Sequence, residues 1–106
     1  MRVLDENSFA GVELGLFSPG ASVSREFAPH ATRAGCVVVD NTSAFRMEED
    51  IPLVVPEVNP EDIALYKNRR IIANPNCSTI QMVLALAPLD KAAGLKRLVV
   101  STYQSV

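Results

Sequence analysis

The sequence predicts an α/β fold whose strands run parallel, and two observations support this prediction. Short apolar runs alternate along the chain with segments that have the length and pattern of helices, as in β-α-β units. One run, CVVV at 36–39, is continuous and largely β-branched, which is typical of a strand buried on both faces of a sheet.

The first part of the chain supplies a strand, a helix and a second strand. A strand predicted at 12–17 ends at the turn signal SPG, 18–20. The helix predicted at 22–34 contains Pro29 as a flaw and meets a natural C-terminal stop at Gly35. The strand at 36–39 follows and ends in a polar loop.

The second part supplies two helices and three short strands. NPED at 59–62 combines an N-cap asparagine, a proline at the first helical position and two acids, which predicts a helix to about residue 67. A mostly apolar helix is predicted at 78–93, and Gly94 ends it. Further strands are predicted at 53–55, 70–73 and 98–103.

Composition limits the classes of function. The chain has 106 residues, of which 48% are apolar and 21% charged, as in one small globular domain. Its net charge of −2 and the lack of a basic patch argue against nucleic acid or an anionic membrane as a partner. The longest apolar run, 82–89, is far shorter than the roughly 20 residues of a membrane span. The first residues do not resemble a signal peptide.

The cysteines and glycines exclude other kinds of site. The two cysteines form no disulfide scaffold, and no Cys/His cluster has zinc-ligand spacing, so we expect a reducing cytoplasm with two free thiols. The glycines match neither a dinucleotide-binding fingerprint nor a P-loop. Polar segments do fall at the carboxyl ends of the predicted strands, where ligands bind in parallel sheets. They are 18–20, 40–46, 74–79 and Gln104.

Cys77 is the principal candidate for chemistry. STIQ at 78–81 fits a capping box with Ser78 as N-cap and Gln81 reaching back. Cys77 then lies just before a helix, where free amides favour a thiolate and can hold an oxyanion. Asn76 can add a side-chain donor. A free cysteine is more commonly a small buried apolar residue, so both interpretations stay open for Cys77 on these grounds, and Cys36 keeps the buried one.

Three other polar residues have a functional and an ordinary interpretation. Arg46 follows a polar strand-end loop and can bind an anion with two N–H groups, or it can be a solvated arginine near acidic neighbours. His30, the single histidine, is either a partner for the thiol or a residue on a helix surface. Gln104 is a site residue or simply a polar strand end.

Four longer segments follow the pattern of one enzyme family. They are LFSPGASVSREFAP at 16–29, VVVDNTSAFRMEEDIPLVVPEVNPEDI at 37–63, IIANPNCSTIQMVLALAPL at 71–89 and VVSTYQSV at 99–106. In this order they resemble a cofactor loop and helix, a turn with a substrate arginine, a nucleophile motif and a glutamine strand of the aspartate-β-semialdehyde dehydrogenase family. The resemblance covers nearly the whole chain, and NPNCST within it is specific.

The resemblance implies a role for each matching residue. Cys77 would form an acyl-thioester with the aspartyl group, and Asn76 would orient substrate or phosphate beside it. Arg46 would bind the phosphate of the acyl-phosphate, and Gln104 would position the substrate for hydride transfer. The implied reaction is the NADPH-dependent reductive dephosphorylation of β-aspartyl phosphate to aspartate semialdehyde and phosphate, in lysine, threonine and methionine synthesis.

The resemblance also implies a cofactor site and a division of the chain. Ser18 and Gly20 would lie near NADP, although Pro19 stands where the family usually has alanine and lacks a backbone N–H. Residues 1–76 would be the C-terminal part of a Rossmann-like NAD(P)-binding domain. Residues 77–106 would start the catalytic and dimerisation domain of a homodimeric or homotetrameric enzyme.

The chain is expected to be a fragment with an incomplete fold. The family's glycine-rich NADP loop and acid–base histidine have no match here, and His30 does not correspond to that histidine. We therefore expect the chain to be inactive alone and to need other protein segments. One alternative is a non-catalytic α/β module that pairs with another chain through an exposed sheet edge. The other is a thiol hydrolase that uses His30.

Overall fold

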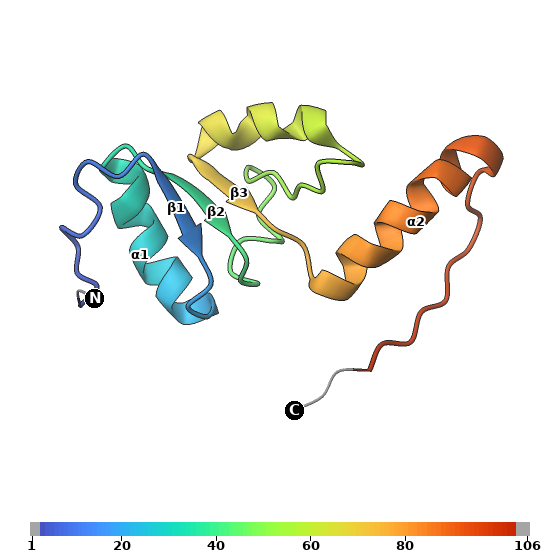
Figure 1. Cartoon of the computed structure of the whole chain (residues 1–106), viewed down its shortest axis with the longest axis horizontal. Helices are drawn as coiled ribbons and strands as arrows, with labels where there is room; N and C mark the ends of the chain where they lie inside the picture. The colour runs from blue at the N-terminus through green and yellow to red at the C-terminus, as the bar shows by residue number, and fades with distance from the viewer. Residues whose placement is uncertain (1–2, 104–106) are drawn as a thin grey trace.

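The computed structural model describes residues 3–103. Three strands form one parallel sheet in the order β1-β2-β3, with helices between them and after the last one (Figure 1). The elements are β1 (Leu14–Phe17), α1 (Ala21–Arg33), β2 (Val37–Asp40), the 3₁₀ helix η1 (Pro60–Asn68), β3 (Ile71–Ala73) and α2 (Cys77–Ala93). The predicted α/β fold with a parallel sheet is confirmed.

The sheet has one buried and one open face. The register pairs Gly15 with Val38 and Val38 with Ile71, so these side-chain positions share a face. This face carries the core, in which Val38 and Ile71 are 0% and 2% exposed and α1 contributes its buried alanines. On the other face Leu14 and Leu16 of β1 remain 58% and 79% exposed. The sheet is therefore covered on one side only.

α1 and α2 each begin one residue before the predicted position. Pro29 lies inside α1 without ending it, and Gly35 follows the helix with a φ of 95°, a value that favours glycine. The predicted helix at 59–67 forms as the 3₁₀ helix η1. Asn59 does not cap η1; its side chain accepts from the Val55 amide and donates to the Leu53 carbonyl instead.

Two predicted strands do not form as such. Residues 53–55 make a single bridge, between Leu53 and Ala73, because the loop touches the edge of β3 and then turns into the segment before η1. Residues 98–103 are extended but belong to no strand, since no neighbouring strand offers its N–H and C=O groups to them. Residues 98–103 therefore have the composition of a strand but no neighbouring strand to pair with.

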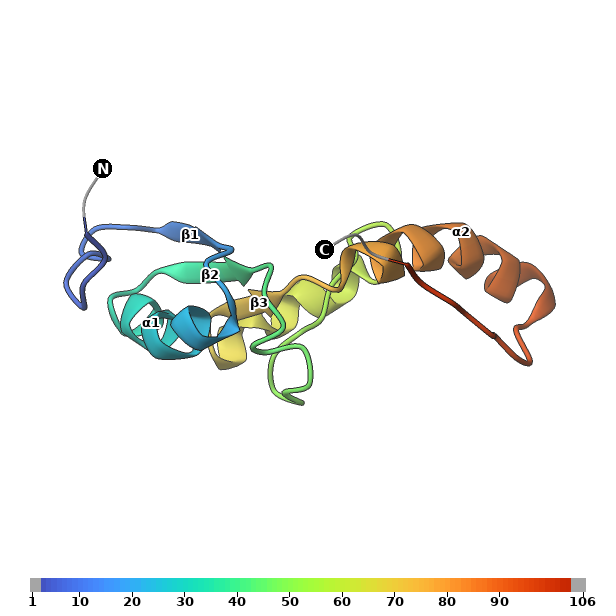
Figure 2. The ribbon, with the colours of Figure 1, turned by 90° about the horizontal axis from the view of Figure 1, so that it is seen from below.

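α2 leads away from the sheet rather than packing on it (Figures 1 and 2). None of its described residues is buried. Gly94, with a φ of 71°, ends the helix, and Asp90 caps it by accepting from the amides of Gly94 and Leu95 at 2.7 Å each. The chain then returns along the helix toward its start (Figure 2). Within residues 3–103, no helix has the length and apolar character needed to cross a membrane.

Candidate active site

Cys77 opens α2, immediately beyond the sheet. β3 ends at Ala73, and three residues connect it to the helix. The N-cap is Asn76, whose side-chain oxygen accepts from the Ser78 amide at 3.0 Å and from the Ser78 hydroxyl at 2.5 Å. The predicted capping box with Ser78 as N-cap is wrong, because the helix already begins at Cys77 and its N-cap is Asn76, two residues before Ser78. Cys77 is thus within the first turn, exposed and not disulfide-bonded.

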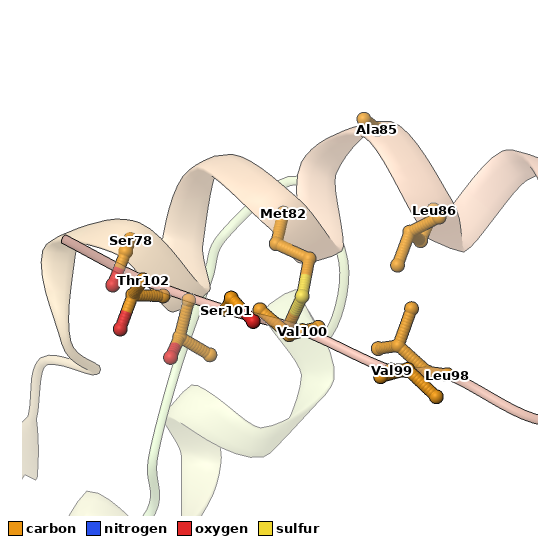
Figure 3. A pocket seen from close by; sticks show the side chains of 10 residues that line it. Ser78, Met82, Ala85, Leu86, Leu98, Val99, Val100, Ser101 and Thr102 are labelled. Carbon is orange, nitrogen blue, oxygen red and sulfur yellow. The ribbon is translucent and has the colours of Figure 1, made fainter.

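The segment that follows α2 brings further residues to the start of the helix. Met82 and Leu86 of α2 and Val100 of the returning segment line one hollow of about 450 Å³, with Ser78 and Thr102 at its end (Figure 3). A second hollow of about 520 Å³ lies around the thiol. It is lined by Asn76, Cys77, Ser78, Thr79, Gln81, Thr102 and Tyr103. Gln104, the predicted substrate residue, lies outside the described residues.

Arg46 is docked onto the backbone at the carboxyl end of the sheet. Its Nε donates to the carbonyl of Asn74 at 2.9 Å, and one terminal nitrogen donates to the carbonyl of Asn41 at 3.0 Å. The side chain is half-buried, so the alternative of a freely solvated arginine does not describe it. Asn74 lies three positions before Cys77 in the chain. Arg46 therefore contacts the turn that leads to the thiol, and its second terminal nitrogen can still bind an anion.

A row of polar side chains crosses the ends of all three strands. The Asn74 amide group donates to the side-chain oxygen of Asn41 at 2.7 Å, and the Asn41 amide group faces the Ser18 hydroxyl at 3.4 Å. Ser18 follows β1, Asn41 follows β2 and Asn74 follows β3. Asn41 and Asn74 were not singled out from the sequence. The signal that could have found them is their position directly after two strands of one parallel sheet.

Ser18 and Gly20 lie at the start of α1. Gly20 is its N-cap position with a φ of 100°, and open space surrounds the place where a Cβ would lie. α1 has no side-chain cap at this end, so its first amide groups have no such partner and can bind an anion. Pro19 supplies no N–H here. Both predicted cofactor residues are exposed at the same edge of the sheet as Arg46.

The structure does not bring His30 to Cys77. The contacts of His30 are to Glu6, at 3.9 Å, to Arg33, at 2.9 Å, and to the Phe27 ring. These neighbours belong to α1 and the N-terminal loop. Within residues 3–103 there is also no group of three or more His, Cys, Asp or Glu side chains that could hold a metal ion.

Comparison with known proteins agrees with this arrangement. Residues 1–66 match the family model of the semialdehyde dehydrogenase NAD-binding domain. The chain belongs to this family. The match covers β1, α1 and β2, so the sheet with the Ser18 and Gly20 turn is part of a Rossmann-like NAD-binding domain.

Relatives in the semialdehyde dehydrogenase family include several aspartate-semialdehyde dehydrogenases. Those of Aquifex aeolicus and Bacillus subtilis are both 62% identical to this chain, over 101 and 99 residues. These matches cover 95% and 93% of the chain but 30% and 28% of the relatives. The chain thus spans about 30% of the length of such relatives, and the predicted resemblance to aspartate-semialdehyde dehydrogenase is confirmed.

Solved structures of this family share the fold. Aspartate-semialdehyde dehydrogenase II of Vibrio cholerae, solved as a complex with ASA (aspartate semialdehyde), is 58% identical with a TM-score of 0.79. The superposition covers 86% of this chain and 29% of that one. The Candida albicans enzyme, solved with NADP, is 33% identical with a TM-score of 0.69, covering 78% and 27%.

Proposed function

We propose that this chain supplies the nucleophile and an anion-binding arginine for the NADPH-dependent reductive dephosphorylation of β-aspartyl phosphate. One observation carries the proposal. The exposed thiol of Cys77 opens a helix, and the turn before it accepts a hydrogen bond from Arg46. A thiol, free first-turn amides and a guanidinium are the groups that acyl transfer from a phosphate needs.

The chemistry begins at the Cys77 sulfur. The thiolate attacks the carbonyl carbon of β-aspartyl phosphate and forms a C–S bond, while the carbonyl oxygen gains negative charge. The first-turn amides of α2 other than that of Ser78, which Asn76 holds, stabilise that charge. The C–O bond to phosphate then breaks, and phosphate leaves with the electron pair. Arg46 binds the departing phosphate through the terminal nitrogen that holds no carbonyl.

Asn76 and Gln104 take supporting roles in this proposal. Asn76 fixes the helix start through Ser78 and thereby orients Cys77. Gln104 follows the returning segment, whose Thr102 and Tyr103 line the hollow around the thiol, and it positions the substrate. The product is released as aspartate semialdehyde when the reduced thioester loses its C–S bond and the thiolate is restored.

NADP fits the uncapped start of α1. Ser18 offers a hydroxyl group, Gly20 leaves open space, and the first amides of α1 suit a phosphate of the dinucleotide. When bound, NADPH supplies the hydride that reduces the thioester. We assign residues 1–76 to the NAD(P)-binding domain and 77–106 to the start of the catalytic domain. The two unpaired cysteines are consistent with a cytoplasmic enzyme.

Acylation of the thiol tests this function directly. The 106-residue chain is incubated with β-aspartyl phosphate and digested, and the peptides are weighed by mass spectrometry. We expect an aspartyl adduct on the peptide that contains Cys77, and none in Cys77→Ser. An adduct that persists in Cys77→Ser, or no adduct in the wild type, would contradict the proposal. Turnover with NADP is not expected from this chain alone, because it needs an acid–base group. The single histidine, His30, contacts Glu6 and Arg33 and not the residues around Cys77.

Association with another chain is a second candidate function, and the exposed apolar surface favours it. Leu84 and Leu89 of α2 are 45% and 59% exposed, and Leu14 and Leu16 lie on the open face of the sheet. Surfaces of this kind are normally covered by protein. Sedimentation of the purified chain distinguishes the two functions, since a stable monomer argues against a non-catalytic module that associates with another chain.

A further inference from the structure

Ser24, Asp40 and Thr42 form a buried polar cluster beneath the site. They are the buried polar side chains in the part of the chain that the structure describes, and Ser24 and Asp40 are fully buried. The Asp40 carboxyl group accepts from the Ser24 hydroxyl at 2.9 Å, from the Thr42 amide at 3.1 Å and from the Thr42 hydroxyl at 2.8 Å. Burying a carboxyl group is costly compared with an apolar side chain, so the cluster calls for a reason beyond packing.

The cluster sets the direction of the chain after β2. The bond from the Thr42 amide to Asp40 closes an Asx turn around Asn41. The Thr42 oxygen accepts in turn from the amide of Ala44 at 3.2 Å. These bonds fix the Asn41 carbonyl, which is one of the two acceptors of Arg46.

The second acceptor of Arg46 also depends on Asp40. The backbone carbonyl of Asp40 accepts from the Asn74 amide at 2.8 Å. The carbonyl of Asn74 itself accepts from the Arg46 Nε. Each carbonyl that holds the guanidinium therefore belongs to a residue whose backbone is fixed by Asp40.

We infer that Asp40 is a positioning residue for Arg46. Its side chain, held by Ser24 and Thr42, fixes the turn that carries the Asn41 carbonyl, and its backbone carbonyl holds the Asn74 amide beside the second acceptor. Asparagine keeps one accepting oxygen but puts an NH₂ group in place of the oxygen that accepts from the Thr42 hydroxyl, so that hydroxyl loses its acceptor. The inference rests on the proposed function in that Arg46 is the group that Asp40 serves.

Hydrogen exchange at the Arg46 side chain tests the inference. The probe is the Nε–H signal of Arg46 in nitrogen NMR spectra of the 106-residue chain, assigned by its loss in Arg46→Lys. We expect Asp40→Asn and Thr42→Val each to speed this exchange by about tenfold, the worth of one hydrogen bond to a charged group. Thr42→Ser keeps the hydroxyl, and Glu49→Gln removes an exposed carboxylate of the same loop. Both should stay within about twofold of the wild type.

Inorganic phosphate separates this inference from the proposed function. If the wild-type chain binds phosphate, Asp40→Asn should raise its Kd by about tenfold and Glu49→Gln should leave it unchanged. If the wild type binds none, the role of Arg46 in anion binding fails, while the exchange comparison still decides the role of Asp40. Exchange within about twofold of the wild type in folded Asp40→Asn would overturn the inference.

The wild-type chain provides a second measurement, which does not depend on any variant folding. The amides of Thr42 and Asn74 and the Nε–H of Arg46 belong to one network, so all three should be protected from exchange and open together as denaturant is added. An Arg46 Nε–H that exchanges freely while both amides remain protected would overturn the inference.

Discussion

Cys36 and Cys77 have opposite surroundings. Cys36 is fully buried between α1 and the sheet, whereas Cys77 is exposed at the start of α2. Burial also raises the pKa of the Cys36 thiol above its ordinary value. A single protein thus contains an exposed thiol and a buried thiol that serves as its internal control.

Alkylation should distinguish the two thiols. Iodoacetamide at neutral pH is expected to modify Cys77 in the native chain and to leave Cys36 unmodified, because only Cys77 is accessible and the thiolate is the reacting form. Peptide mass spectrometry reads the result. Cys77→Ser should resist modification until denaturant is added; labelling of Cys36 in the native chain at a similar rate would contradict the structure.

The buried thiol also predicts a dependence of stability on pH. Because the pKa of Cys36 is raised above 9.0 in the folded chain, the folded state keeps this proton to a higher pH than the unfolded state. The stability that the protonated thiol contributes is complete below about pH 9 and is lost as pH rises through the folded-state pKa. The difference in free energy of unfolding between wild type and Cys36→Ala, measured in urea, should therefore be constant below about pH 9 and shrink as the pH rises above it. A constant difference would disprove this.

Arg46 should matter more to stability than an exposed arginine does. Lysine at position 46 can reach one carbonyl but not hold two with a planar fork, so Arg46→Lys should cost about 1–2 kcal/mol in free energy of unfolding. Arg69→Lys is the control, because Arg69 pairs with Glu48 and Asp50 at 3.5 and 3.3 Å on the surface. It should cost less than about 0.5 kcal/mol. Equal costs in urea titrations would argue against the docked geometry.

Sequence alone predicted the candidate nucleophile and the arginine but missed their environment. NPNCST and the loop before Arg46 carry local signals, namely a helix start and a polar strand end. Asn41 and Asn74 bond to side chains 23 and 33 residues away in the sequence, and Asp40 is buried. No local sequence pattern reveals either property. The register between the strands determines which of these residues lie side by side.

At the scale of elements, the start of α2 depends on one side chain. Asn76→Ala removes the cap that accepts from the Ser78 amide and should cost the helix about 1 kcal/mol. We expect faster amide exchange at residues 78–81 and lower helicity by circular dichroism. Asn76→Asp keeps an accepting oxygen and should preserve both. Unchanged exchange in Asn76→Ala would show that another group caps the helix.

Elements with an internal signal were predicted well, and those that need a partner were not. α1, α2 and the three sheet strands agree with the prediction within one residue at every boundary but one. The exception is the start of β1, where Val12 and Glu13 precede the strand. Residues 53–55 and 98–103 have strand propensity, yet a strand also requires a neighbour, which a propensity does not provide.

At the scale of the whole molecule, apolar surface exceeds what a small monomer usually exposes. α2 has no buried residue, and one sheet face is open. We expect the purified chain to self-associate, with a concentration-dependent sedimentation coefficient. Leu84→Lys with Leu89→Lys should reduce association. Leu65→Lys should not, because Leu65 is 49% exposed but belongs to η1 rather than to α2 or the sheet. A wild-type chain that stays monomeric would contradict this expectation.

The three-residue connection between β3 and α2 has a consequence for how the protein can vary. One inserted residue lengthens an extended chain by about 3.5 Å, which exceeds the length of a hydrogen bond. An insertion between Asn74 and Cys77 would leave Arg46 bound to the Asn74 carbonyl and would lengthen the path from that carbonyl to the thiol by this amount. The length of this connection is therefore under a stricter constraint than most loops, which tolerate insertions readily.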